Sequence, residues 1–496
     1  MEKRDLAASP QLNRRRFIGG LVGGGTALAG VTSALSLISL SGGGTAAAAT
    51  ATTALTIPPL LSPTTTDGVD VYTLDMQTGT HQVISGVTSS SAGFNGSYLG
   101  PTIKVANGDS VRMDVTNNLG ADTTVHWHGA HVPAKVDGGP QVAFASGETW
   151  SPAFTINQEA ATLWYHPHAL GTTAKQVSQG LAGMLIVDDD SDTSAALPSE
   201  YGVDDIPIIL QCLASSAAGD VKYDVTGYRT SGLVFPVLVN GVNADSTTFT
   251  FAATKRRIRL RFLNASLSDI ITIQRSDGAT LTQVATEQGY LTSATEVSTI
   301  RLVAGSRAEV VIDAADAPTI QAVITTGWIA GGSGTYPILS ITDNSSDTPA
   351  DLPSTLNTIT RYDTSGFTAR TITLGQSGAT MLINGVAGTT EAAMEANMIM
   401  TTVGAKEIWT IKNSTQLEHS FHLHDVPFQV ISINGTAASG VDLGWKDTVE
   451  VIGTGTVVIA MEFTDYTDDT YMYMLHCHLA QHEDEGMMAG HMVTAS

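Results

Sequence analysis

The chain has 496 residues and a formal net charge of −23, from 47 acidic and 24 basic side chains. A chain of this length exceeds what one hydrophobic core supports, so we expect two to four domains. The acidic balance argues against nucleic acid or an anionic membrane surface as a partner. Lysine and glutamate are sparse while Gly, Thr, Ala and Val are abundant, which is typical of an all-β protein with short turns.

The first 50 residues are predicted to be a targeting segment that takes no part in the fold. Residues 13–18 read Asn-Arg-Arg-Arg-Phe-Ile and resemble the twin-arginine export signal of bacteria. A Gly-rich apolar stretch follows to about Leu40, and the alanines at 46–49 suit a cleavage site. Because Gly and Ser interrupt that stretch, a removable signal is favoured over a membrane span. We therefore expect twin-arginine export to the periplasm or the cell exterior, with no membrane span in the mature chain.

Beyond residue 50 the chain repeats one layout three times. Each copy has a turn with Gly-Pro or Asn-Gly, followed by a strand of alternating apolar and polar residues. Three copies of this size predict three β-sandwich domains, joined by acidic, Ser- and Pro-rich linkers at 188–199 and 343–354. The predicted domain bounds are 52–192, 200–346 and 358–496.

Ten of the 13 histidines fall into four clusters, two in the first copy and two in the third. In chain order the clusters are His126-Trp-His128, His166-Pro-His168, His419-Ser-Phe-His422-Leu-His424 and His476-Cys-His478-Leu-Ala-Gln-His482. Imidazoles with one thiolate, and no second cysteine nearby, suit copper better than a structural zinc site. Because the middle copy has none of these histidines, we expect the first and last domains to build the site jointly, with the middle domain as a spacer.

Strand geometry divides these ligands into two sets. Side chains two residues apart share a face of a strand, so His476 and His478 face one way and Cys477 the other. The same parity yields eight imidazoles, enough to hold a cluster of three metal ions: His126, His128, His166, His168, His422, His424, His476 and His478.

The remaining set is His419, Cys477 and His482, with Met487 five residues further on. Two imidazoles, a thiolate and a weak axial thioether describe a blue-copper electron-transfer site. Core packing is the alternative for Met487. The other cysteine, Cys212, lies in an apolar run and is expected to be a buried strand residue without a disulfide.

Four motifs in this order, HxHG, HxH, HxxHxH and HCHxxxH, resemble those of the multicopper oxidases, which include laccases, bilirubin oxidases and bacterial cuprous oxidases. The resemblance spans the mature chain, including Leu99-Gly-Pro and Gly444-Trp-Lys-Asp447, and is greatest to bacterial members with three cupredoxin domains. It implies an all-β fold of three consecutive cupredoxin-like Greek-key sandwiches and four copper ions. The ligands it implies are His126 and His422 for type 2 copper; His128, His166, His168, His424, His476 and His478 for the type 3 pair; and His419, Cys477, His482 and Met487 for type 1.

The resemblance also implies a reaction, in which a small-molecule reductant gives up electrons one at a time and dioxygen is reduced to water by a monomeric enzyme. Electrons would enter at an exposed edge of His482 or His419 and pass through Cys477 to its two histidine neighbours. Because the reduction of dioxygen consumes protons, carboxylates are needed near the cluster. Asp137 and Glu483 match family residues with that role, and a surface acid or a turn residue is the alternative for each.

The third copy also bears on the substrate. Between Asn384 and Glu407 it is short and holds three methionines, whereas cuprous oxidases of the family often carry a long methionine-rich insertion. We therefore expect laccase-like oxidation of phenols or aromatic amines at an open type 1 site, with Glu418 as a candidate acceptor for a phenolic proton. Oxidation of cuprous, ferrous or manganous ions is the alternative, and copper storage or electron transfer without oxygen uptake is a third hypothesis. We expect Met472 and Met474 to pack on a strand, and a methionine face that handles copper is the alternative.

Overall fold

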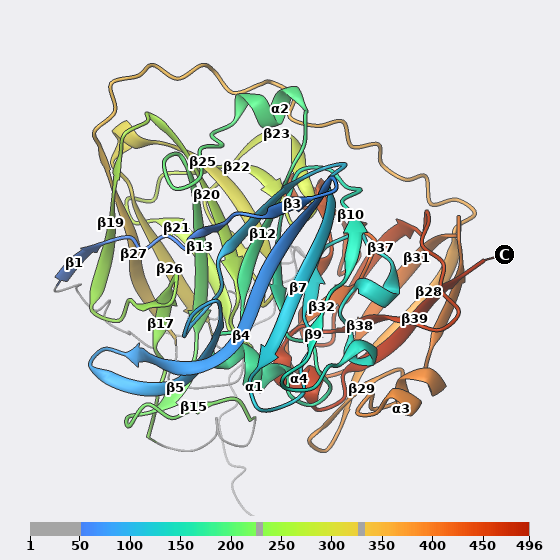
Figure 1. The fold of residues 1–496 in the computed structure, drawn as a ribbon. Helices are drawn as coiled ribbons and strands as arrows, with labels where there is room; N and C mark the ends of the chain where they lie inside the picture. The colour runs from blue at the N-terminus through green and yellow to red at the C-terminus, as the bar shows by residue number, and fades with distance from the viewer. Residues whose placement is uncertain (1–50, 225–231, 326–332, 496) are drawn as a thin grey trace, which may run out of the picture. The chain divides into compact units, whose positions relative to one another are not determined.

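The computed structural model describes residues 51–224, 232–325 and 333–495. Regular structure in these ranges is almost all β-strand, and the sheets pack in pairs as sandwiches, which confirms the all-β prediction (Figure 1). None of the helices in these ranges is long and apolar enough to cross a membrane. The predicted targeting segment, with its twin-arginine motif, lies outside the described residues.

The first sandwich pairs a five-stranded sheet, in the order β2-β6-β12-β11-β8, with a sheet in the order β10-β7-β4-β3 to which β5 and β9 are added. Its strands are β2 (Leu60–Leu61), β3 (Thr64–Thr66), β4 (Val69–Ile84), β5 (Val87–Phe94), β6 (Thr102–Ala106), β7 (Ser110–Asn118), β8 (His126–His128), β9 (Thr149–Trp150), β10 (Ala153–Thr155), β11 (Ala161–His166) and β12 (Gly183–Asp188).

The second sandwich pairs a seven-stranded sheet, β18-β17-β13-β20-β25-β22-β23, with a six-stranded one, β1-β19-β27-β26-β21-β24, and a small sheet β15-β14-β16 lies beside them. Its strands are β1 (Ala51–Ala54), β13 (Asp205–Cys212), β14 (Ala214–Ser216), β15 (Val221–Lys222), β16 (Leu233–Val234), β17 (Val237–Val239), β18 (Val242–Asn243), β19 (Thr247–Ala253), β20 (Arg257–Asn264), β21 (Ile270–Arg275), β22 (Leu281–Thr286), β23 (Gly289–Val297), β24 (Ile300–Leu302), β25 (Arg307–Asp313), β26 (Thr319–Thr325) and β27 (Gly334–Asp343).

The third sandwich pairs a seven-stranded sheet, β29-β28-β31-β37-β33-β34 with β35 added, with a five-stranded one, β30-β39-β38-β32-β36. Its strands are β28 (Thr368–Ser377), β29 (Thr380–Ile383), β30 (Ile399–Thr402), β31 (Lys406–Asn413), β32 (His419–Leu423), β33 (Phe428–Ile433), β34 (Thr436–Ala437), β35 (Trp445–Lys446), β36 (Thr448–Val451), β37 (Thr456–Glu462), β38 (Tyr473–Cys477) and β39 (Met488–Thr494).

Short helices occupy the connections between strands. The α-helices are α1 (Thr173–Ser178), α2 (Asp192–Ala196), α3 (Glu391–Ala396) and α4 (Ala480–Asp484), and the 3-10 turns are η1 (Ala134–Val136), η2 (Pro140–Val142), η4 (Ala314–Asp316) and η5 (Gly440–Leu443).

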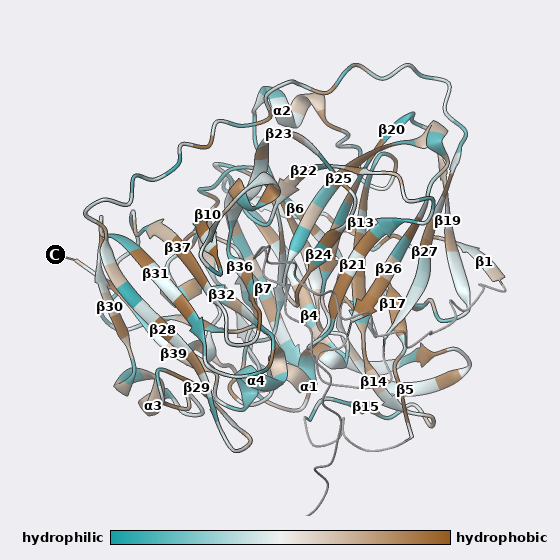
Figure 2. Cartoon of the chain, turned by 180° about the vertical axis from the view of Figure 1, so that it is seen from behind, coloured by the Kyte–Doolittle hydropathy of each residue, from teal (hydrophilic) through white to brown (hydrophobic). Residues whose placement is uncertain are grey.

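Each sandwich encloses its own apolar core between its two sheets. Strand alternation produces these cores: β31 buries Trp409 and Ile411 and exposes Lys406 and Lys412. Figure 2 shows hydrophobic residues alternating with polar ones along the strands of all three sandwiches. Burying the alternate apolar residues removes their surface from water, which is the main favourable contribution to folding.

The second sandwich differs from the predicted layout at its first strand. Strand β1 pairs in parallel with β19, although residues 52–54 fall within the predicted first domain. On β20, Arg259 and Arg261 are buried, because the first sandwich covers that face and Thr162 of β11 contacts Arg261. Buried carboxylates, including Glu309, pair with both arginines. The exact domain bounds stay a prediction.

Candidate metal centre

Two pairs of neighbouring strands carry the clustered histidines. Strands β8 and β11 of the first sandwich are antiparallel and pair His126 with His166. Strands β32 and β38 of the third sandwich are also antiparallel and pair His422 with His476. The two strand pairs meet, since the imidazoles of His128 and His422 stack with their centroids 3.7 Å apart. The site therefore forms at the contact between the first and third sandwiches.

One histidine group consists of His128, His166 and His478, whose candidate ligand atoms lie within 4.8 Å of one another. The carbonyl of Pro167 accepts a hydrogen bond from His166 Nδ1 at 2.8 Å, which leaves Nε2 for the group. Among the described residues, His128 Nδ1, His166 Nε2 and both nitrogens of His478 have no hydrogen-bond partner. Burial lowers the pKa of His478 to about 3, so its imidazole is neutral and has a lone pair for a metal ion.

A second group consists of His168, His424 and His476. Nε2 of His476 lies 3.2 Å from Nε2 of each of the other two. Their Nδ1 atoms face carboxylates: Asp137 Oδ2 lies 2.7 Å from His424, and Glu483 lies 3.1 Å from His476 and 3.4 Å from His168. A carboxylate on one ring nitrogen fixes the tautomer and directs the other nitrogen to a metal.

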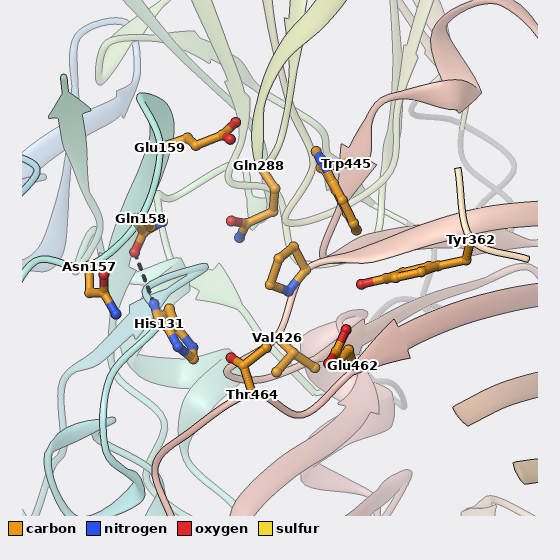
Figure 3. Close-up of a pocket in the computed structure, with 11 residues that line it drawn as sticks. His131, Asn157, Gln158, Glu159, Gln288, Tyr362, Val426, Trp445, Glu462 and Thr464 are labelled. Carbon is orange, nitrogen blue, oxygen red and sulfur yellow. Dashed lines mark hydrogen bonds between the residues drawn. The ribbon is translucent and has the colours of Figure 1, made fainter. Parts of the chain in front are cut away.

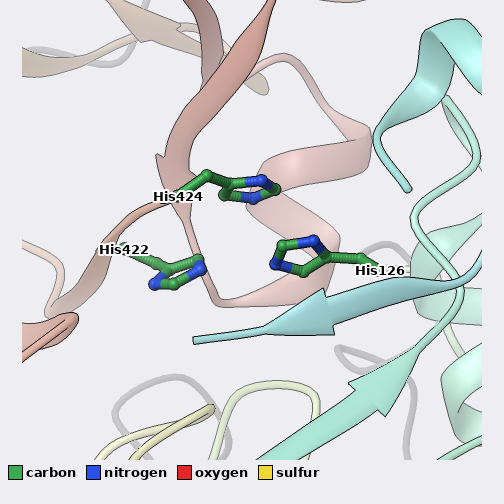
Figure 4. Close-up of side chains that lie close together, drawn as sticks. All are labelled: His126, His422 and His424. Carbon is green, nitrogen blue, oxygen red and sulfur yellow. The ribbon is translucent and has the colours of Figure 1, made fainter. Parts of the chain in front are cut away.

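The remaining pair of the eight, His126 and His422, is oriented by main-chain carbonyls. His126 Nδ1 donates to Asp137 O at 2.9 Å, and His422 Nδ1 donates to Asp447 O at 2.8 Å. Within the part of the chain that the structure describes, neither Nε2 has a hydrogen-bond partner. Figure 4 shows the rings of His126 and His422 directed towards each other, with His424 beside them. The unpartnered nitrogens fit a metal ion between the two rings.

The thiolate group consists of His419, Cys477 and His482. Cys477 Sγ lies 3.5 and 3.6 Å from Nδ1 of the two histidines, and Thr415 Oγ1 lies 2.8 Å from His419 Nε2 and fixes that ring. Burial raises the pKa of the Cys477 thiol to about 12, and a bound metal would reverse this by stabilising the thiolate. Met487 is fully buried in the same core, and its carbonyl accepts from Cys477 N at 3.0 Å.

These groups match the division that strand parity predicts. His476 and His478 belong to the two imidazole groups, whereas Cys477 between them belongs to the thiolate group. The segment from His476 to His478 therefore supplies one residue to each of three groups, two of imidazoles and the one with the thiolate. The assignment of individual residues to individual ions stays a prediction.

Both predicted proton carriers lie at the histidines and are buried, at 1% exposure for Asp137 and 2% for Glu483. They are not surface acids. Burial raises the pKa of Glu483, but the adjacent imidazoles of His168 and His476 outweigh it and leave the pKa lowered. The neighbouring Asp484 accepts hydrogen bonds from the first amides of α1.

The predicted exposed imidazole edge at the thiolate group is wrong. His419 is 1% and His482 2% exposed, because loops of the second sandwich pack over them. In one loop, Ala304 O accepts a hydrogen bond of 2.8 Å from Ser420 Oγ. In the other, Leu267 O accepts one of 2.9 Å from the first amide of α4. A crevice of about 10 Å³, too small for more than one water molecule, lies beside His419. The prediction of an open site failed because the covering residues come from a distant part of the sequence.

Sequence reasoning also missed the carboxylate of Asp447, which contacts His128 and His422. Asp447 Oδ1 lies 3.3 Å from His128 Nε2, and the carboxylate binds Arg307 and Gln288 of the second sandwich. The Gly444-Trp-Lys-Asp447 run could have indicated it, but this run was interpreted only as part of the family resemblance. The second sandwich is therefore more than a spacer, although none of its described residues belongs to a histidine group.

A cavity of about 250 Å³ lies where the three sandwiches meet, and Gln288, which binds Asp447, lines it (Figure 3). Its lining residues are His131, Asn157, Gln158, Glu159, Gln288, Tyr362, Val426, Pro427, Trp445, Glu462 and Thr464. His131 lies between Asp425 and Asp465, at 2.7 and 2.6 Å, and belongs to none of the candidate metal groups. Burial opposes protonation of His131, but these carboxylates raise its pKa to about 9.

Comparisons with known proteins agree with this donor set. Two family models described as multicopper oxidase match residues 75–192 and 351–496. The chain is 33% identical over 449 residues to the multicopper oxidase mco of Staphylococcus aureus, covering 89% of this chain and 92% of that protein. It is 32% identical over 426 residues to the cell division protein FtsP of Escherichia coli, covering 80% of this chain and 84% of that protein.

Solved structures agree as well. A laccase-like multicopper oxidase from Ochrobactrum sp. superposes with a TM-score of 0.79 at 30% identity, over 89% of this chain and all of that one. This likeness confirms the prediction of cupredoxin-like domains. By sequence, by fold and by its grouped imidazoles and thiolate, the chain belongs to the multicopper oxidases, a family of copper-binding oxidoreductases.

Proposed function

We propose that the chain couples one-electron oxidation of phenols or aromatic amines to the four-electron reduction of dioxygen to water. The observation that carries this proposal is the pair of linked ligand sets, eight converging imidazoles and one thiolate group, joined by Cys477 between His476 and His478. Bound copper would supply one-electron redox chemistry at the thiolate group and dioxygen reduction at the imidazoles. The chain's own residues hold these ions, exclude water and handle protons.

Four ions account for the ligands. Unpartnered or converging nitrogens support each set among the imidazoles, and the Sγ and Nδ1 atoms at 3.1 to 3.6 Å support the thiolate set. The proposed ligands are His126 and His422 for type 2 copper; His128, His166 and His478 for one type 3 ion and His168, His424 and His476 for the other; and His419, Cys477, His482 and Met487 for type 1.

Asp137 and Glu483 are the proposed proton carriers. Asp137 contacts His424 on its Nδ1, and Glu483 contacts His168 and His476 in the same way. Each carboxylate thus lies one imidazole away from the space between the converging nitrogens. Removing the carboxylate would lower oxygen consumption without removing a ligand.

The donor class is supported by one relative and qualified by the burial of the type 1 ligands. The Ochrobactrum oxidase is described as active towards lignin model compounds and lignosulfonate, which are aromatic. Because His419 and His482 are buried here, an aromatic donor docks on the covering residues near Glu418, and its electron crosses that layer to the imidazole.

A metal-ion donor is the second candidate, and the same burial favours it. Glu418 lies next to His419. Arg301 pairs with both Glu418, at 3.6 Å, and Glu450, at 2.7 Å. Two carboxylates beside a buried imidazole suit a small hard cation, such as manganous or ferrous ion, better than a flat ring, whereas cuprous ion prefers softer ligands.

The deciding experiment is oxygen uptake by copper-loaded protein with a phenol, a non-phenolic dye, Cu(I) and Mn(II) offered separately, beside a visible spectrum and a copper count. Four coppers per chain, an intense blue band and uptake with organic donors support the laccase-like proposal. Uptake only with Cu(I) or Mn(II) supports the metal-ion alternative. A blue band without uptake on any donor contradicts both and favours copper storage or electron transfer.

We also propose that the chain is exported by the twin-arginine route and works as a monomer in the periplasm or outside the cell. Replacing Arg14, Arg15 and Arg16 by lysine is expected to leave the protein in the cytoplasm. Cell fractionation and light scattering test the two statements separately.

A further inference from the structure

Side chains from all three sandwiches converge on the carboxylate of Asp447. We propose that Arg307 and Gln288, both from the second sandwich, are positioning residues that act through Asp447 to orient His128 and His422. This inference rests on the proposed copper assignment and adds a role for the sandwich that has no histidine ligand.

Asp447 contacts two histidines through different atoms. Its main-chain carbonyl accepts from His422 Nδ1 at 2.8 Å, and its Oδ1 lies 3.3 Å from His128 Nε2. Holding Nδ1 of one ring and Nε2 of the other leaves His422 Nε2 and His128 Nδ1 for metal binding. Those are the two nitrogens that have no partner among the described residues. A shift of Asp447 would therefore turn ligands of two different groups at once.

The orientation of Asp447 is set by three donors. Arg307 donates from Nη1 to Oδ1 at 2.8 Å and from Nη2 to Oδ2 at 2.6 Å, in the two-pronged geometry that suits a guanidinium and a carboxylate. Gln288 Nε2 adds a bond to Oδ2 at 2.6 Å, and Thr448 Oγ1 adds one to Oδ1 at 2.8 Å. Despite burial, Arg307 holds the pKa of Asp447 below its ordinary value.

Arg307 is itself fixed from several sides. Its Nε donates to Thr162 O in the first sandwich at 2.8 Å, and its terminal nitrogens donate to Gly305 O at 3.1 Å and Glu287 O at 3.2 Å in its own sandwich. One buried guanidinium thus binds the first, second and third sandwiches. Lysine, with a single nitrogen, cannot make this set of bonds.

Gly129, the last letter of the HxHG motif, supports this arrangement independently. Its φ is +89°, and a Cβ atom there would lie 2.7 Å from Arg307 Nη2, 2.7 Å from Asp447 Oδ2 and 2.9 Å from Gln288 Nε2. A residue without a Cβ atom is therefore required beside this hydrogen-bonded cluster. The Gly129 carbonyl accepts a hydrogen bond from Gln288 Nε2 at 2.8 Å.

Gln288 has a second contact that makes the inference testable. The same side chain lines the 250 Å³ cavity (Figure 3). Its amide nitrogen also bonds to Asp447 Oδ2, so it links that cavity to the carboxylate. Loss of the amide would loosen Asp447 and admit solvent to it. Both effects would speed the loss of copper from the imidazole groups.

The test compares Arg307→Gln, Arg307→Lys and Gln288→Leu with the control Arg259→Gln, a buried arginine of the same sandwich that pairs with Glu309. The readouts are the type 2 electron paramagnetic resonance signal, the rate of copper release to a chelator, the blue band, and the melting temperature of the copper-free protein. We expect about 10- to 100-fold faster release from the imidazole groups and an altered type 2 signal in Arg307→Gln, with the blue band retained. Arg307→Lys and Gln288→Leu should give smaller changes of the same kind.

The control separates positioning from stability. Arg259→Gln should lower the melting temperature and leave the type 2 signal and release rate unchanged. If Arg307→Gln does only the same, or if it does not fold and Gln288→Leu releases copper at the wild-type rate, the inference is wrong. A wild-type protein that has no type 2 signal would instead contradict the proposed function, whatever the variants do.

Discussion

The imidazole groups and the thiolate group differ in how many parts of the chain they require. The eight histidines come from the first and third sandwiches, and the second supplies Arg307 and Gln288 around them. The residues of the thiolate group all lie in the third sandwich, within 419–487. The imidazole groups therefore take their ligands from two sandwiches and supporting residues from the second, whereas the ligands of the thiolate group come from one sandwich, although loops of the second cover it. Changes at the Asp447 cluster should affect the imidazole groups and spare the thiolate group.

The largest effect is expected from removing the sulfur that joins the two regions. Cys477→Ser should abolish the blue band and oxygen uptake, because the alcohol replaces the thiolate ligand. Copper at the imidazole groups should persist, as detected by its paramagnetic resonance signal. Cys212→Ala, at the buried cysteine of the second sandwich, is the control and should keep the band. Loss of the band in both variants would contradict a unique role for Cys477.

A loss of about 10- to 100-fold in kcat is expected for Asp137→Asn, because the amide replaces a carboxylate that contacts His424 at 2.7 Å. The blue band should be unchanged, since Asp137 belongs to the other region. Oxygen-electrode assays measure the first quantity and a visible spectrum the second. Asp465→Asn, at the half-exposed partner of His131, should stay within about twofold of wild type. Equal losses in the two variants would remove the special role of Asp137.

The contact between the first and third sandwiches should weaken with rising pH. Asp425 and Asp465 raise the pKa of His131 to about 9, above the value near 6.5 of an unfolded histidine. Its charged form therefore stabilises the fold fully below about pH 6.5, and this contribution is lost as the pH rises through 9. Over that window the unfolding free energy of copper-free wild type should fall by roughly 1–3 kcal/mol more than that of His131→Gln.

Urea unfolding of the copper-free protein at a series of pH values measures this difference. His81→Gln, whose ring stacks on Tyr98, is the matched control and should keep the wild-type pH dependence. Parallel curves for wild type and His131→Gln would show that the ion pairs do not form in solution.

The smallest effect is expected at the surface next to the thiolate group. Burial raises the pKa of Glu418, which suits acceptance of a phenolic proton. Glu418→Gln should slow phenol oxidation by about two- to tenfold and spare a non-phenolic dye. Glu450→Gln, which shares Arg301 as its partner, is the control. Equal loss on both donors would remove the proton-acceptor hypothesis, and loss confined to a metal-ion donor would favour the alternative substrate class.

Local patterns in the sequence predicted the parts of this molecule that depend on local geometry. Strand alternation and the one-residue offset of Cys477 from His476 indicated two ligand sets, and the structure brings those residues together in that way. The failures concern contacts between sandwiches. Nothing near His419 in the sequence indicates that loops around Leu267 and Ala304 cover it.

The sequence analysis made no prediction of charges buried between sandwiches. Arg259 and Arg261 alternate with apolar residues on β20, and the first sandwich covers them. Arg307 begins β25 with no motif around it, and only the tertiary fold brings it to Asp447. Charges that pair across domains have no periodic signature, so a single sequence gives no sign of their burial.

The bonds of Arg307 also follow the order in which the chain is made. Thr162 and Arg307 precede Asp447 in the sequence, and domains generally fold as units from the N-terminal side during synthesis. The first two sandwiches can therefore fold and hold the Arg307 guanidinium in place while the third is still being translated. When the third sandwich docks, it places the Asp447 carboxylate against this guanidinium and adds four of the eight histidines. Metal uptake at the imidazole groups would then be the final event of folding, because no earlier intermediate has a complete set of ligands.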